Sequence, residues 1–233
     1  MRCVNFAIGV HNHQPVGNPH TIFEKAYRKA YLPFLEVLEK HPSVKVTLHY
    51  SGSLLDWLLT NHPDFIERLK KLVLRGQAEL MTGGYYEPIL AIIPDDDKVG
   101  QIKKLTQFIK EHLAVEPQGM WLAERVWEPH LAKPISEAGV SYTVLDDAIF
   151  TGVGLQENEM YGYYIVEEQG RVLNVFPINQ KLRYLIPFQK PGKTIAYLRN
   201  IADENGKPLV VIADDGEKLG LWPQTYELVY EQG

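Results

Sequence analysis

Residues 44–84 read "VKVTLHYSGSLLDWLLTNHPDFIERLKKLVLRGQAELMTGG". The first seven of them, 44–50, alternate in polarity and are rich in β-branched residues, which predicts a strand. Helical spacing of the apolar residues predicts a helix over 53–76, broken near Pro63. Residues 78–84 predict a second short strand that runs into a glycine turn. Strand, helix and strand in this order form a βαβ unit, in which the two strands are parallel.

The same alternation continues on both sides of this unit. We expect further strands at 4–10, 119–124, 141–147 and 208–217, a β-hairpin at 163–178 that turns at Gln169–Gly170, and helices at 23–41, 94–113, 129–139, 193–203 and from 223 onward. Strands thus alternate with helices about six times, which predicts a parallel sheet. Polar residues follow nearly every strand, and this favours a (β/α) barrel over an open sheet with one switch point.

Composition excludes several classes of function. The 233 residues carry a net charge of −5 without a basic block, so no nucleic-acid partner is expected. No apolar run reaches membrane-spanning length, and the first residues lack the features of a secretory signal, so no membrane association is expected. The single cysteine suits a reducing compartment such as the cytoplasm. Nucleotide-binding glycine motifs are absent from the sequence, so no nucleotide cofactor is indicated.

The stretch 121–129, "WLAERVWEP", carries the sharpest functional signal. It places Glu124 at the end of an apolar strand, where a carboxylate must be paired or titrate abnormally. Trp121 and Trp127 flank it, and aromatic faces suit the binding of sugar rings. The alternative is a buried structural ion pair.

Two acidic pairs follow predicted strands, in "LDDAIF" (145–150) and "IADDGEKLGLW" (212–222). Asp214 and Asp215 point to opposite sides of an extended chain, so only one of them is expected to take part in chemistry. The pair could also serve only a turn or a helix cap. Two carboxylates that face each other across a pocket are what glycosidic bond cleavage requires.

The stretch "HNHQP" (11–15) places His11 and His13 on one side of an extended chain. They could bind a polar substrate, ligate a metal or be ordinary loop residues. Glu79 lies inside a short apolar run and could reach the same site or face solvent.

Four motifs, "HNHQP" (11–15), "GQAEL" (76–80), "WLAERVWEP" (121–129) and "DDGEKLGLWP" (214–223), resemble in order and spacing those of glycoside hydrolase family 57. The resemblance implies a (β/α)7 barrel and a retaining 4-α-glucanotransferase or α-amylase activity on α-1,4-glucans or maltooligosaccharides, without a cofactor or obligatory metal. It implies that Glu124 is the nucleophile and Asp215 the general acid/base. The residues that it places around the sugar are His11, His13, Glu79, Trp121, Glu217 and Trp222.

The chain departs from the family pattern in three places. It ends before the family's last motif, so we expect 1–233 to be a barrel incomplete at its C-terminus, without the downstream helical and C-terminal domains. Ala213 stands where relatives commonly have His, and Ala148 and Ile149 replace a Tyr-His pair. Two alternatives stay open: an inactive, truncated glucan-binding domain, and a metal-dependent enzyme of the polysaccharide deacetylase or α-mannosidase kind.

Overall fold

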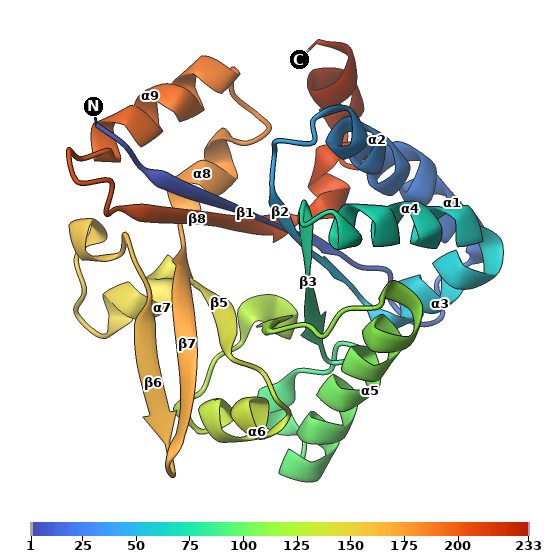
Figure 1. Ribbon diagram of the computed structural model, residues 1–233, viewed down its shortest axis with the longest axis horizontal. Coiled ribbons are helices and arrows are strands. Elements are labelled where there is room, and N and C mark those ends of the chain that lie inside the picture. The colour runs from blue at the N-terminus through green and yellow to red at the C-terminus, as the bar shows by residue number, and fades with distance from the viewer. Residues whose placement is uncertain (1, 233) are drawn as a thin grey trace.

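A computed structural model describes residues 2–232, and their centre is a closed barrel of seven parallel strands (Figure 1). The barrel strands are β1 (Asn5–Asn12), β2 (Val46–Tyr50), β3 (Ala78–Gly83), β4 (Gly119–Trp121), β5 (Tyr142–Asp146), β7 (Arg171–Ile178) and β8 (Leu209–Asp215). Each pairs with its neighbours in the parallel sense, and β8 returns to β1. The expected (β/α)7 barrel is therefore confirmed.

Closure of the barrel is uneven. β1 and β8 pair from Asn5 and Leu209 to His11 and Asp215. β7 and β8, in contrast, pair only at Ile178 and Val211. β7 also pairs in the antiparallel sense with β6 (Tyr164–Glu168), on the edge away from β5. This is the hairpin predicted for 163–178.

Helices surround the barrel (Figure 1). They are α1 (His20–Ala26), α2 (Leu32–Lys40), α3 (Gly52–Asn61), α4 (Pro63–Leu74), α5 (Asp95–Leu113), α6 (Ala132–Glu137), α7 (Asp147–Gly152), α8 (Gln180–Leu185) and α9 (Pro191–Ile201). The break at Pro63 is as predicted. A π-helical turn, Tyr27–Tyr31, joins α1 to α2 just before Pro33. The helix expected from residue 223 is limited to a π-helical turn, Glu227–Glu231.

Two hydrophobic layers hold the barrel. The outer layer lies between the first strands and the helices α1–α5, where Leu48, Leu54 and Leu105 are fully buried. The inner layer fills the barrel with side chains such as Met81 and Trp121. This layer closes the barrel below its carboxyl end, so polar residues at the strand ends lie over an apolar floor. Within the described part, no helix has the length and hydropathy needed to cross a bilayer.

The strand predicted for 119–124 is shorter than expected, because β4 ends at Trp121. Glu124 and Arg125 follow in a tight turn with φ values of 52° and 53°. Both values lie in the left-handed region, which side chains with a Cβ rarely adopt. The turn lifts Glu124 off the end of the strand and leaves it exposed.

Candidate active site

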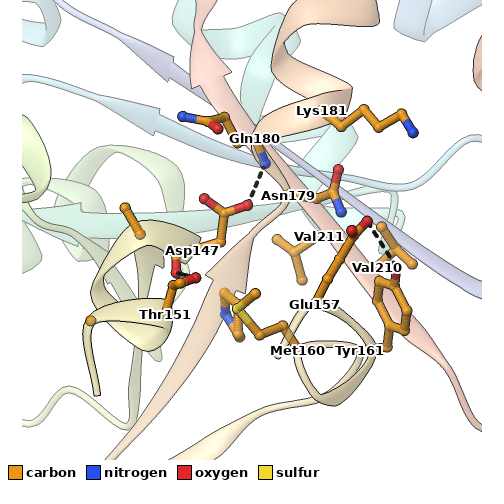
Figure 2. Close-up of a pocket in the computed structure, with 13 residues that line it drawn as sticks. Asp147, Thr151, Glu157, Met160, Tyr161, Asn179, Gln180, Lys181, Val210 and Val211 are labelled. Carbon is orange, nitrogen blue, oxygen red and sulfur yellow. Dashed lines mark hydrogen bonds between the residues drawn. The ribbon is translucent and has the colours of Figure 1, made fainter. Parts of the chain in front are cut away.

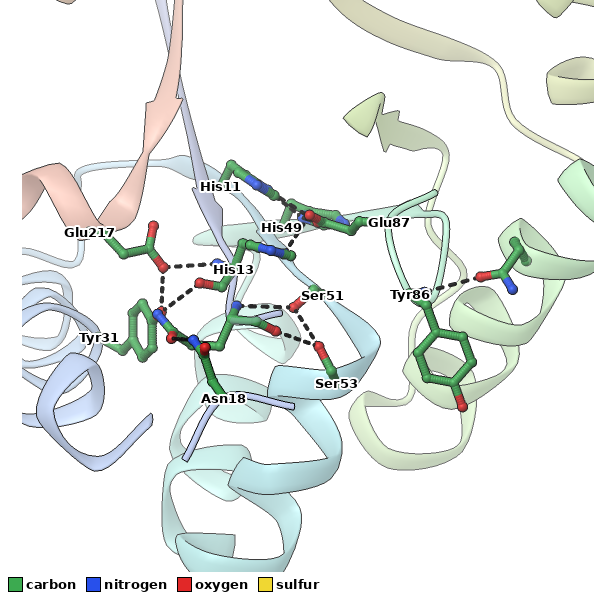
Figure 3. A network of polar contacts seen from close by, with 12 residues as sticks. His11, His13, Asn18, Tyr31, His49, Ser51, Ser53, Tyr86, Glu87 and Glu217 are labelled. Atoms are coloured by element: carbon green, nitrogen blue, oxygen red, sulfur yellow. Dashed lines mark hydrogen bonds and ion pairs between the residues drawn. The ribbon is translucent and has the colours of Figure 1, made fainter. Parts of the chain in front are cut away.

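Polar side chains from four segments meet at the carboxyl end of the barrel (Figure 3). His11 and His13 come from the end of β1, His49 from β2, and Glu87 from the turn after β3. Glu217 follows β8 and accepts a hydrogen bond from the backbone N–H of His13 at 2.9 Å. The parallel strands all end at this face, which is why residues far apart in sequence come together here.

His11 is buried between two other rings. Its imidazole stacks on Trp121 with ring centroids 4.4 Å apart, and its Nδ1 lies 2.8 Å from Nδ1 of His49. Burial lowers the pKa of His11 well below its usual value, and the neighbouring His49 adds to this effect. Burial likewise lowers the pKa of His49 to about 3. Both imidazoles are therefore neutral at pH 7.

His13 and Glu87 form an ion pair, with 2.5 Å between Nδ1 and a carboxylate oxygen. Burial opposes protonation of His13, but the hydrogen bond and the charge of Glu87 outweigh it, so the pKa of His13 is raised. Burial raises the pKa of Glu87, against the stabilising effect of His13. The negative charge of Glu124 is a lesser cause that raises the pKa of both groups.

Glu217 is a buried carboxyl group held by two donors, the backbone N–H of His13 and the hydroxyl of Tyr31. Burial raises its pKa to about 7, despite both hydrogen bonds. Asp215 lies two residues earlier and adds to the shift.

Asp215 is half-buried at the end of β8, where it pairs in register with His11. Burial raises its pKa, and the charges of Asp214 and Glu124 raise it further, while Arg125 opposes them. Asp215 and Glu124 are thus close enough to interact across the mouth of the barrel. Their catalytic roles stay predictions.

Asp214 takes a different part, as strand alternation predicts. Its carboxylate accepts hydrogen bonds from Lys218 at 2.5 Å and Arg183 at 3.2 Å. Arg183 also pairs with Asp146, which in turn binds Arg125 at 3.0 Å. These ion pairs connect the ends of β5 and β8 to the turn after β4 that contains Glu124.

The structure does not bring all predicted sugar-binding residues together. Glu79 lies near the start of β3, at the amino end of the barrel, where it is exposed and accepts a hydrogen bond from Tyr142 at 2.6 Å. Its exposure agrees with the solvent-facing alternative. In the register of the strands, His11 lies level with Met81, two residues further along β3 than Glu79. Trp222, 43% exposed, lies beyond Glu217 in the segment that follows β8.

Sequence reasoning missed Tyr31, His49 and Glu87 as members of the site. His49 lies inside a strand pattern, and Tyr31 reads as a helical core residue. Glu87 had the clearest signal, since it follows the paired Gly and Tyr residues after β3. Its φ of 52° turns the carboxylate back toward the histidines.

The three substituted positions lie outside the histidine and carboxylate cluster. Ala213 is buried in the inner layer of the barrel, and Ile149 packs against a core cluster beside α6. Ala148 lines a separate cavity of about 630 Å³ (Figure 2). In that cavity the carboxylate of Asp147 accepts a hydrogen bond from the backbone of Gln180 at 2.9 Å.

Residues 7–233 match the profile of the family described as "Glycosyl hydrolase family 57". The chain is 54% identical to "Alpha-amylase 1" of Dictyoglomus thermophilum, covering 100% of the chain and 34% of the relative. It is 48% identical to the "4-alpha-glucanotransferase" of Thermococcus kodakarensis, covering 100% and 36%. The crystal structure of 4-alpha-glucanotransferase from Thermococcus litoralis superimposes with a TM-score of 0.98 at 47% identity, over 100% of this chain and 36% of that one. The chain spans about a third of the length of these relatives, and it belongs to glycosyl hydrolase family 57.

Proposed function

We propose that this chain provides the catalytic barrel of a retaining enzyme that cleaves and transfers α-1,4-glucans, a 4-α-glucanotransferase or an α-amylase. The observation that carries the proposal is the position of Glu124 and Asp215. Asp215 ends β8 and Glu124 lies in the turn just after β4, so both are at the carboxyl end of the barrel, where the ring of His11 stacks on Trp121. Retaining glycosidases need two carboxyl groups placed across one sugar.

In this mechanism Asp215 protonates the leaving oxygen while Glu124 attacks the anomeric carbon, which forms a glucosyl ester. The raised pKa of Asp215 favours the protonated form of this carboxyl group, which the first step needs. Once Glu124 is esterified its negative charge is gone, and one of the effects that raise the pKa of Asp215 disappears. Asp215, which gave its proton to the leaving oxygen in the first step, therefore stays ionised more readily and can take the proton of the attacking hydroxyl as the base in the second step.

The second step decides the product. Water attacking the ester gives hydrolysis, and a sugar hydroxyl of another glucan gives transfer. His11, His13 and Glu217 would hold hydroxyl groups of the bound glucose, since they offer both donors and acceptors at the floor of the site. Trp121 lies under His11 and Trp222 near the rim, where an aromatic face could stack on a sugar. We also propose a cytoplasmic location, which the single cysteine of the sequence supports.

The test is incubation with maltoheptaose and separation of the products by length. We expect products both shorter and longer than the substrate for a transferase, and only shorter ones for a hydrolase. Glu124→Gln and Asp215→Asn should each abolish them. Glu128→Gln is the matched control, because Glu128 is an exposed carboxylate four residues after the proposed nucleophile.

Other outcomes would support other functions. Glucan binding without products would identify a binding domain. Activity lost on chelation and unaffected by Glu124→Gln would identify a metal-dependent carbohydrate enzyme. Full activity of both carboxylate variants would overturn the proposed mechanism.

A further inference from the structure

We propose that His11, His13, His49 and Glu87 form a binding site for a borderline divalent cation, of which Zn²⁺ is the representative. The sequence suggested metal ligation only as one reading of two histidines, and the family resemblance implies no obligatory metal. The site we infer rests on the convergence of four ligand atoms.

Three of these atoms form a compact triangle. Nδ1 of His11 and Nδ1 of His49 are 2.8 Å apart, and each lies 3.7 Å from Oε1 of Glu87. A point equidistant from the three atoms is about 2.0 Å from each, which matches Zn–N and Zn–O bond lengths. The triangle is therefore of the right size for the ion, and tetrahedral coordination needs only a small shift of the ligands that lets the ion leave their plane.

His13 supplies the fourth ligand. Ligand atoms of His11, His13 and Glu87 all lie within 4.8 Å of one another. Nδ1 of His13 lies 2.5 Å from Oε2, the other carboxylate oxygen of Glu87, and the His13 side chain is the more exposed of the two. Three imidazoles and one carboxylate are ligands that Zn²⁺ commonly takes, in a tetrahedral arrangement.

Three buried atoms of the cluster make no hydrogen bond within residues 2–232: Nδ1 of His13, which forms an ion pair with Glu87, Nε2 of His49 and Oε1 of Glu87. Oε1 of Glu87 is buried without a hydrogen bond, and the side chain is 9% exposed. A buried carboxylate oxygen without a donor is costly. Nδ1 of His11 and Nδ1 of His49 are each 3.7 Å from this oxygen, too far for a hydrogen bond. A cation at the centre of the triangle would satisfy this oxygen.

The surroundings hold the ligands in place. Trp121 stacks on the ring of His11. A Cβ at Gly83 would lie 2.7 Å from Nε2 of His49, so the glycine is what leaves room for that ring. Rigid ligands bind a metal with less loss of conformational freedom.

Occupation of the site would block the sugar. His11 and His13 are residues that the proposed function assigns to the glucan, so a bound cation should inhibit the glucan reaction. This consequence rests on the proposed function, whereas binding of the cation does not.

The experiment is calorimetric titration of the chelator-treated protein with ZnCl₂, with melting temperature as a second readout. We expect one ion per chain and a rise in melting temperature. Glu87→Gln and His13→Asn should each weaken binding by at least about 10-fold. His62→Gln is the matched control, because His62 pairs with Glu24 at 2.8 Å outside the cluster.

His49→Asn tests the third imidazole, and circular dichroism checks that this buried variant folds. Should it fail to fold, the Glu87 and His13 variants still decide the question, because their side chains are nearer the surface. Equal affinity in the wild type, Glu87→Gln and His13→Asn would overturn the proposal. So would absence of Zn²⁺ binding to a folded, glucan-active protein. Zn²⁺ binding by a protein that is inactive on maltoheptaose would instead leave the site standing and count against the proposed function.

Discussion

The buried carboxyl group of Glu217 should make stability depend on pH. Burial raises its pKa from 4.5 to about 7, so the ionised form is disfavoured in the folded state. One pKa unit corresponds to about 1.4 kcal/mol, and the full shift therefore amounts to about 3 kcal/mol. Glu217→Gln removes the charge and keeps an oxygen that can accept from Tyr31 and from the backbone of His13.

The sign follows from proton binding. Between pH 4.5 and about 7 the folded state holds a proton that the unfolded chain has lost, so stability falls as pH rises through this window. The Gln variant lacks this dependence. Its free energy of unfolding should equal that of the wild type near pH 4.5 and exceed it by about 3 kcal/mol above pH 7.

The assay is urea unfolding of both proteins at intervals from about pH 5 to pH 8, with the free energies extrapolated to water. Subtracting the two curves cancels groups that titrate alike in both proteins; His13 is not one of them, because the charge of Glu217 is among the effects that raise its pKa. Glu128→Gln, which removes an exposed carboxylate, should show no such difference. A wild-type-to-Gln difference that does not change with pH would refute the reasoning.

Further predictions concern packing and charge, each read from the free energy of unfolding. Gly52→Ala should destabilise by about 1–3 kcal/mol, because the new Cβ would lie 2.4 Å from the ring of Tyr85. Gly100→Ala, inside α5 with open space around it, should instead stabilise by about 1 kcal/mol, and a loss would contradict this. Arg183→Met should cost at least about 2 kcal/mol, because it leaves two aspartates short of a partner. Arg28→Met breaks only an exposed pair and should cost less than about 1 kcal/mol; equal costs would refute the comparison.

The strands and their order followed from local patterns, since alternation and apolar runs are properties of short segments. The same holds for the break at Pro63 and for the hairpin turn. In that turn, Gln169 and Gly170 both have φ above zero. Helices α7 and α8, of six residues each, were not predicted.

The site was predictable only in part. Carboxylates at strand ends could be found by position, and Asp215 and Glu217 lie where that rule places them. The end of β4 could not be found, because the turn at Glu124 and Arg125 depends on Asp146, a partner from another strand. The role of Glu87 depends on histidines that come from β1 and β2, and no local pattern records that contact.

The left-handed turn at Glu124 and Arg125 has a consequence for directed evolution. Each residue costs about 1–2 kcal/mol relative to glycine in that conformation. A library of variants selected for thermal stability alone should therefore enrich glycine at both positions. At position 124 that enrichment would remove the carboxylate to which we assign the chemistry, so selection for stability and selection for turnover should diverge at this residue.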